Sequence, residues 1–230
     1  MSGPKLLLWD IDGTLVCTDR AGEKALLESV RQLYQIDWKD ELPIDLRGRT
    51  DRYIFRELLT RASQELGTEQ EARMRNTYLS LLEKMLPLGA AKLHAGIQEA
   101  LDAVHAHPEI HQGLLTGNLE EGAKLKLTHL GIWHYFEFGA FANDSANRNE
   151  LGPFALRRAK EKLGIEFAPE NVYIIGDTAH DIACGKAIGA KTIALATGAF
   201  SVAELVAEKP TYVFPDLSDT AALLKITLSS

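Results

Sequence analysis

The chain has 230 residues, 46% of them hydrophobic and 25% charged, with a formal net charge of −7 at pH 7. This composition is ordinary for a soluble globular protein, and the length suffices to bury a core without disulfides or a structural metal. The acidic charge argues against nucleic acid or an anionic membrane as the main partner. The two cysteines, Cys17 and Cys184, lack metal-site spacing and are expected to stay reduced.

The N-terminal segment carries no pattern of a targeting signal. Its apolar run, residues 5–9, is far shorter than a signal peptide or a membrane span requires. We therefore expect a cytoplasmic protein.

The first predicted element is a buried strand at residues 5–9, because its apolar run stops at the charged Asp10. Three helices with one apolar face each follow, and they are predicted at residues 21–34, 51–66 and 68–86. For the third helix we expect Thr68 as the N-cap, with Glu71 completing a capping box.

After residue 87 the pattern changes to an alternation of strands and helices. Strands are predicted at residues 113–116, 136–141, 172–175, 192–196 and 211–214. Helices are predicted at residues 96–106, 120–130, 153–163 and 181–188. Such an alternation predicts a parallel sheet with helices on both faces. The predicted fold is therefore α/β, a Rossmannoid three-layer core of residues 1–15 and 88–230 interrupted by an all-helical insertion at residues 16–87.

Polar side chains follow three of the predicted strands directly. They form the segments Asp10-Ile-Asp12-Gly13-Thr14, Thr116-Gly117-Asn118 and Gly176-Asp177-Thr178-Ala-His-Asp181. Ligands of open α/β sheets bind at the carboxyl ends of the strands, so the three segments should converge on one crevice. Several carboxylates held together need a cation, and hard oxygen ligands favour Mg²⁺. A phosphoryl group would supply a further oxygen ligand and the reason for the metal.

With these motifs the chain resembles, over nearly its whole length, the haloacid dehalogenase superfamily, in particular its phosphoglycolate-phosphatase-like branch with a helical cap. The resemblance implies that Asp10 attacks phosphorus and forms an aspartyl-phosphate. It also implies that Asp12 is the general acid and base. Asp10, Asp12 (through its carbonyl) and Asp177 would bind Mg²⁺, with Asp181 in a supporting role.

The same resemblance assigns the phosphate-binding groups. Thr116 and the backbone amides of Gly117 and Asn118 would hold phosphate oxygens. Gly13, which permits the tight turn after Asp10, and Thr14 are assigned to the same binding region.

The chain departs from the family at the third motif, where a lysine, often followed by proline, is usual. Arg148 lies on a loop between a predicted strand and a predicted helix, where that cation belongs, and a guanidinium can pair with both Asp10 and phosphate. Arg157, Arg158 and Lys160 are the alternatives, although a solvated helix face explains each of these three better.

The insertion contains a glycine turn, Arg47-Gly48-Arg49, directly before a predicted helix. In relatives with a cap this loop reaches over the active site, so Arg47 and Arg49 are candidates to bind a second anionic group of the substrate. Alternatively they are surface charges, and Thr50 or Asp51 simply caps the helix.

The predicted function is a Mg²⁺-dependent phosphomonoester hydrolase acting on a small phosphorylated metabolite. Phosphoglycolate, a sugar phosphate and a nucleoside monophosphate all stay open as substrates, and the sequence carries no signal for oligomeric state. Two alternatives are a phosphosugar mutase of the same fold and a non-catalytic phosphate-binding relative. The second alternative predicts loss of Asp10, Asp12 or Asp177, and all three are present.

Overall fold

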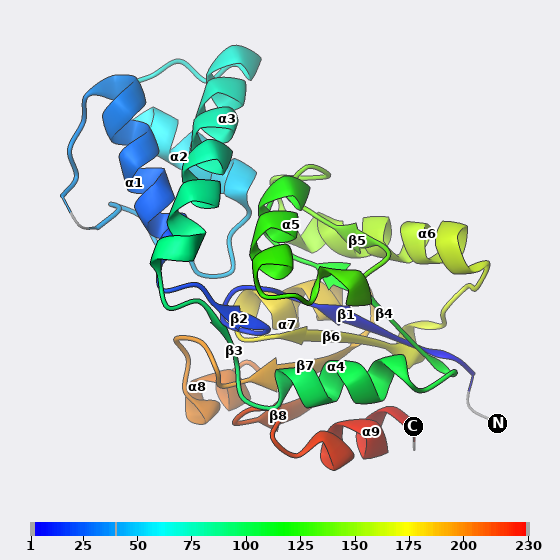
Figure 1. Cartoon of the computed structure of the whole chain (residues 1–230). Helices are drawn as coiled ribbons and strands as arrows, with labels where there is room; N and C mark the ends of the chain where they lie inside the picture. Colours follow the sequence, from blue (N-terminus) through cyan, green and yellow to red (C-terminus); the bar gives the residue numbers. More distant parts are fainter. Residues whose placement is uncertain (1–2, 40, 229–230) are drawn as a thin grey trace.

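A six-stranded parallel sheet lies at the centre of the protein (Figure 1). The computed structural model describes residues 3–39 and 41–228. The strands lie in the order β5-β4-β1-β6-β7-β8. They are β1 (Lys5–Trp9), β4 (Ile110–Leu115), β5 (Gly139–Ala140), β6 (Val172–Gly176), β7 (Lys191–Leu195) and β8 (Tyr212–Phe214). β1 is buried throughout and pairs with β4 and β6, so the polar segments after these three strands come to one edge.

Helices cover both faces of the sheet. One face carries α4 (Ile97–His105), α5 (Glu120–His129) and α9 (Thr220–Leu228), and the other α6 (Leu151–Leu163), α7 (Ala179–Ala187) and α8 (Val202–Ala207). Alternation along β1 separates the two cores, since Leu7 and Trp9 pack on the first set of helices while Leu6 and Leu8 pack on the second. The predicted three-layer α/β fold is confirmed.

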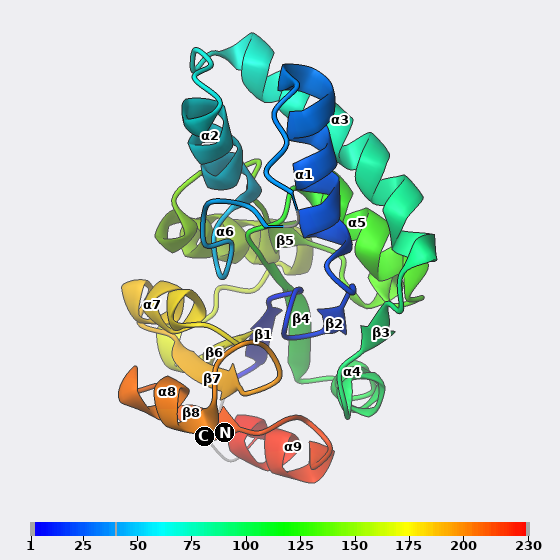
Figure 2. The same cartoon turned by 90° about the vertical axis from the view of Figure 1, so that its left-hand side faces the viewer.

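Three further helices form a group beyond the carboxyl ends of the strands (Figures 1 and 2). They are α1 (Ala21–Tyr34), α2 (Asp51–Arg61) and α3 (Thr68–Met85), and we call them the three-helix unit. Their facing apolar side chains build a core of their own, with Val30 of α1, Phe55 of α2 and Tyr78 of α3 all buried. Each helix is amphipathic, as its sequence period predicts.

A two-stranded antiparallel pair joins this unit to the sheet. β2 (Val16–Cys17) leads into α1, β3 (Lys92–Leu93) returns from α3, and Val16 pairs with Leu93. Neither strand is predictable from the sequence, because two residues are too few to show a period.

Several predicted boundaries were wrong. α2 ends at Arg61 instead of residue 66, and Ser63, just beyond it, has a positive φ of 54°. The N-cap of α3 is Gly67, without a side-chain cap, and Thr68 is already helical. The strand expected at 136–141 is only β5, because a 3₁₀ turn and an irregular segment precede it.

On the C-terminal side, α6 and α7 begin two residues earlier than predicted, and α8 and α9 were not predicted. Short 3₁₀ helices cover Leu86–Leu88, Trp133–Tyr135, Arg148–Glu150 and Pro169–Asn171. Among the residues that the structure describes, none of the helices combines the length and the apolar character needed to cross a membrane.

Truncating a side chain of the central strand should lower stability strongly. Leu8 is 0% exposed, so Leu8→Ala removes buried apolar surface and leaves a cavity, and the free energy of unfolding should fall by about 2–5 kcal/mol. Leu88→Ala is the matched control, because Leu88 is 84% exposed and its loss should change the value by less than about 0.5 kcal/mol. Urea unfolding measures both, and equal effects of the two variants would contradict this packing.

Candidate active site

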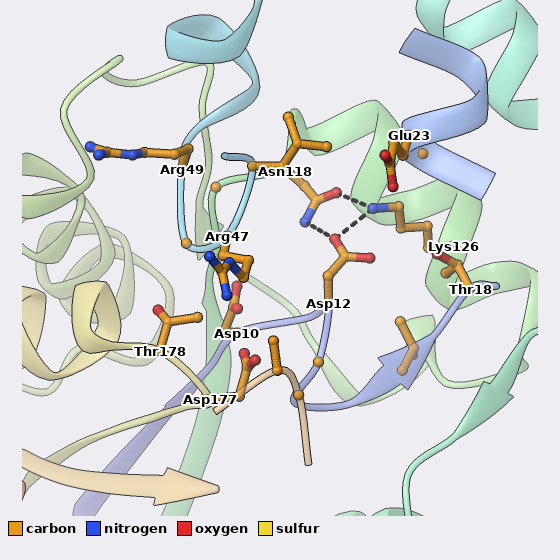
Figure 3. Close-up of a pocket in the computed structure, with 18 of the residues that line it drawn as sticks. Asp10, Asp12, Thr18, Glu23, Arg47, Arg49, Asn118, Lys126, Asp177 and Thr178 are labelled. Carbon is orange, nitrogen blue, oxygen red and sulfur yellow. Dashed lines mark hydrogen bonds and ion pairs between the residues drawn. The ribbon is translucent and has the colours of Figure 1, made fainter. Parts of the chain in front are cut away.

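The polar segments after β1, β4 and β6 do meet, and they line a cavity of about 570 Å³. Asp10, Asp12 and Asp177 lie on its sheet side, while Leu26 and Tyr78 of the three-helix unit lie on the other (Figure 3 shows the acidic residues). The cavity therefore lies between the sheet edge and the three-helix unit.

Three buried carboxylates gather at the bottom of this site. Asp10, Asp177 and Asp181 each offer an oxygen atom, and these atoms lie within 4.8 Å of one another. Burial raises the pKa of Asp10 to about 6, although the Arg148 guanidinium opposes this shift. Burial, together with the charges of Asp181 and Asp10, raises the pKa of Asp177 to about 8. A hard divalent cation would relieve this repulsion, so the oxygen donors present fit Mg²⁺.

Asp181 is already engaged by protein donors. Its Oδ2 accepts from the backbone N–H and the hydroxyl of Thr178, at 3.0 and 2.7 Å, and its Oδ1 accepts from Arg148. Asp10 and Asp177 are therefore the better placed carboxylates for a cation, and the position of Asp181 agrees with a supporting role.

Two glycines lie against the Asp177 carboxylate. A Cβ at Gly13, where φ is +80°, would lie 2.4 Å from Oδ2, and one at Gly198 would lie 1.8 Å from the same atom. The hydroxyl of Thr14 donates to Oδ1 at 3.2 Å. Thr14 is fully buried, so in this structure it contacts Asp177 and not the cavity. Close backbone approach thus shapes the space around Asp177.

Arg148 is the cation that faces Asp10. Its Nη2 lies 2.9 Å from Asp10 Oδ1 and also binds Asp181, and its Nη1 donates to the carbonyl of Gly48 at 3.3 Å. Burial opposes its charge, but Asp10 and Asp181 raise the pKa of Arg148 above its ordinary value.

The alternative cations lie elsewhere and have other acidic partners. Arg157 pairs with Glu161, Arg158 with Asp144 and Lys160 with Glu166. The structure therefore brings Arg148, and none of these three, to Asp10.

The Asp12 carboxylate is held apart from the acidic cluster. Its Oδ2 accepts from Asn118 Nδ2 at 2.8 Å and from Lys126 Nζ at 2.6 Å (Figure 3). Lys126 also donates to Asn118 Oδ1 at 2.6 Å, and Asn118 Nδ2 donates to Thr116 Oγ1 at 2.9 Å. Asn118, Thr116 and Asp12 thus belong to one hydrogen-bonded chain.

Sequence reasoning missed Lys126. The available signal was a lysine on the buried face of the 120–130 helix, which also carries Gly122, Ala123 and Leu127. A buried lysine needs partners of opposite charge, and those partners come from other segments of the chain.

The loop before α2 approaches the site through its backbone. Arg47 pairs with Asp45 and lies over the ring of Phe200, while Arg49 lies over the ring of Tyr53. In Figure 3 the Arg49 side chain points away from the acidic cluster. In this structure the two guanidiniums therefore have partners outside the carboxylate cluster.

Asp51 attaches the three-helix unit to the segment after β4. Its backbone N–H donates to the Gly117 carbonyl, and its Oδ2 accepts from the Leu119 N–H, both at 2.7 Å. A Cβ at Gly117 would lie 2.1 Å from the Arg49 carbonyl oxygen, so glycine is required for this contact. Burial raises the pKa of Asp51 to about 6, although the Lys126 ammonium acts against this. Thr50 caps α2, as the sequence allowed.

Comparison with known proteins finds relatives among the hydrolases and phosphatases. A family model described as haloacid dehalogenase-like hydrolase matches residues 7–195. A probable phosphatase, IndB, of Dickeya dadantii is 27% identical over 97% of this chain and 96% of its own length. The pyrophosphatase PpaX of Bacillus mycoides is 25% identical over 95% of both chains. A crystal structure of a predicted phosphoglycolate phosphatase from Haemophilus somnus has a TM-score of 0.73 at 20% identity, covering 99% of both chains.

The chain belongs to the haloacid dehalogenase-like hydrolases. Since the similar curated proteins are named as phosphatases, the enzyme class that the motifs predict, a phosphatase of this superfamily, is confirmed.

The crowded carboxylates should make the metal-free protein less stable as pH rises. A carboxyl group whose pKa is raised by folding binds more protons in the folded state, so stability falls between its ordinary pKa, about 3.9 for Asp, and its folded value. For Asp177 that window extends to about pH 8. Asp177→Asn should therefore be more stable than the wild type at pH 8 without metal, with a smaller difference near pH 4.

Thermal unfolding with a chelator and with excess Mg²⁺ measures this effect. Mg²⁺ should raise the melting temperature of the wild type at pH 8 and raise that of Asp177→Asn much less. Glu161→Gln is the control, because the Glu161 side chain is 66% exposed and its removal should leave both responses unchanged. A metal-free Asp177→Asn variant that melts below the wild type at pH 8 would contradict the interpretation.

Proposed function

We propose that the protein is a Mg²⁺-dependent phosphomonoester hydrolase that works through an aspartyl-phosphate on Asp10. The observation that carries the proposal is the different environment of two carboxylates only two residues apart. The Asp10 side chain is 6% exposed and ion-paired with Arg148, whereas the Asp12 side chain is 44% exposed and bound by Lys126 and Asn118. Carboxylates in such different surroundings can take different chemical roles.

In the first step an Asp10 oxygen attacks phosphorus and the bond to the leaving oxygen breaks. A carboxylate needs no base to become a nucleophile at neutral pH. Arg148 holds Asp10 Oδ1 and so orients the attacking group. Asp12 gives its proton to the leaving oxygen. In the second step Asp12 takes a proton from water, which attacks phosphorus, and Asp10 is released with inorganic phosphate.

The phosphate oxygens would be bound by the segment after β4. The backbone amides of Gly117 and Asn118 are candidate donors. The hydroxyl of Thr116 accepts from Asn118 and keeps its own proton to donate. Thr116 is fully buried and outside the cavity lining in this structure, so its contact with a phosphate oxygen would require a local shift. The turn of Gly13 and Thr14 supports this region through Asp177.

Asp10, Asp177 and the carbonyl of Asp12 would hold Mg²⁺, with Asp181 supporting the cluster through Arg148. When bound, the cation would supply positive charge that neutralises the phosphoryl oxygens.

The three-helix unit would act as the cap, with residues 16–87 forming the cap domain and residues 1–15 and 88–230 the catalytic core. The cavity of about 570 Å³ suits a small phosphorylated metabolite in the cytoplasm. Arg47 and Arg49 are candidates to bind a second anionic group of that substrate, and for Arg47 this would require exchange of its partner Asp45. The names of the relatives, phosphatase and pyrophosphatase, support a phosphate ester or anhydride as the substrate class.

Replacement of the nucleophile tests the proposal. Asp10→Asn should lower kcat on small phosphate esters by at least about a thousandfold, because the amide cannot attack phosphorus, while the fold stays intact by circular dichroism. Asp19→Asn is the matched control, since the Asp19 side chain is 52% exposed and pairs only with Lys24 among the ion pairs described. Near-wild-type turnover by Asp10→Asn would contradict the assignment.

Metal removal is the second test. The wild type should lose phosphate release in the presence of a chelator and recover it with Mg²⁺, on a panel of sugar, nucleoside and carboxylic acid phosphates. Following the phosphoryl group separates hydrolysis from the mutase alternative, because a hydrolase passes it to water and a mutase returns it to the sugar. Activity that survives chelation would contradict the metal dependence.

A further inference from the structure

Lys126 is a buried cation beside the site, and the reaction scheme leaves it without a role. It projects from α5, its side chain is 4% exposed, and its ammonium lies 2.6 Å from both Asp12 Oδ2 and Asn118 Oδ1. Burying an ammonium is costly unless acceptors offset the lost hydration, and here a carboxylate and an amide oxygen do so. A solvated lysine on a helix surface would have no such arrangement.

The contacts of Lys126 make the two Asp12 oxygens unequal. Oδ2 accepts from Lys126 Nζ and from Asn118 Nδ2, so two strong donors occupy its lone pairs. In Figure 3 the dashed lines from both donors end on Oδ2, and the other oxygen carries none and lies on the side on which Thr18 is labelled. Thr18 belongs to the lining of the cavity. The oxygen Oδ1 is therefore the one available to a group bound in the cavity.

We propose that Lys126 is a positioning residue for the general acid, and this inference rests on the proposed function. Lys126 and Asn118 hold Oδ2, so that Oδ1 is the atom that exchanges the proton. As the phosphorus–oxygen bond breaks, the proton on Asp12 Oδ1 moves to the leaving oxygen. When water attacks the aspartyl-phosphate, Oδ1 takes a proton from that water, and the cycle closes with Asp12 protonated again.

The surroundings of Lys126 join this role to the three-helix unit. A Cβ at Gly22 of α1 would lie 3.8 Å from Lys126 Nζ and 3.6 Å from the hydroxyl of Tyr78 of α3. Gly22 of α1 and Tyr78 of α3 thus lie near the ammonium. The Lys126 side chain is 4% exposed and the Asp12 side chain 44% exposed, so solvent screens this pair less than a pair of two exposed groups.

A positioning role makes a distinctive prediction about leaving groups. A general acid matters most when the leaving oxygen is a poor leaving group, such as that of an alkyl phosphate, and little when it is a good one, such as dinitrophenolate. Lys126→Met should therefore lower kcat/KM for alkyl phosphates by about ten- to a hundredfold and for dinitrophenyl phosphate by less than about threefold. A structural defect would lower both alike, and that result would overturn the proposal.

The control variant comes from the same helix. Lys124 is exposed on α5, and Lys124→Met should leave kcat/KM unchanged for every leaving group. Lys126→Arg keeps a cationic donor and should recover part of the activity on alkyl phosphates. Circular dichroism and thermal unfolding check that each variant is folded.

A double-mutant cycle with Asp12→Asn completes the test. If Lys126 acts only through Asp12, adding Lys126→Met to Asp12→Asn should lower kcat/KM for alkyl phosphates little further. Additive losses of kcat/KM from the two substitutions would overturn the proposal. The two levels of inference fail differently. If Asp12→Asn itself shows no dependence on the leaving group, the general-acid assignment in the proposed function is wrong. If Asp12→Asn shows it and Lys126→Met does not, only the role of Lys126 is wrong.

Discussion

The site depends on the enforced closeness of like charges at the end of a buried sheet. Asp10, Asp177 and Asp181 lie so near one another that ionising all three is unfavourable. Within the part of the chain that the structure describes, Arg148 is the guanidinium that pairs with two of them, Asp10 and Asp181. Burial first, and the neighbouring carboxylates second, raise the pKa values of Asp10 and Asp177. Crowded, buried carboxylates destabilise the folded protein unless a cation binds among them. The oxygen donors present fit such a cation together with an anionic substrate. The repulsion that destabilises the cluster without a cation also favours the binding of a cation to it.

Much of the fold and part of the site could be predicted from the sequence, because the decisive signals are local. The strand at β1 appears as an apolar run that stops at Asp10, and Gly13 after it allows the turn that lies against Asp177. Parallel strands then bring distant motifs together without further information. Arg148 could be predicted because the family resemblance places a cation between a strand and a helix at this point of the chain, where Arg148 lies.

The missed features depend on contacts between segments that are remote in sequence. Lys126 is informative only once Asp12 and Asn118 are known to lie beside it, and the sequence places these residues on three different elements. Asp51 looked like a helix cap, yet its carboxylate accepts from Leu119, and Thr50 provides the cap. Arg47 and Arg49 were predicted to face the substrate. The backbone of their loop does approach the site, but in this structure Arg47 pairs with Asp45 and Arg49 lies over the ring of Tyr53. The tertiary packing determines which partners these side chains contact, and neither periodicity nor composition predicts those contacts.

The short pair of β2 and β3 has a mechanical consequence. The two segments that connect the three-helix unit to the sheet pair with each other as β2 and β3, so they form one joined connection and not two independent linkers. The first strand of this connection, β2, begins at Val16, four residues beyond Asp12. The turn between them is braced, since the Gly13 N–H donates to the Val16 carbonyl at 3.0 Å and Asp12 bridges to Val16. The helices are therefore linked directly to the turn that carries Asp12, and under the proposed function a tilt of the helices would shift the proposed general acid as well.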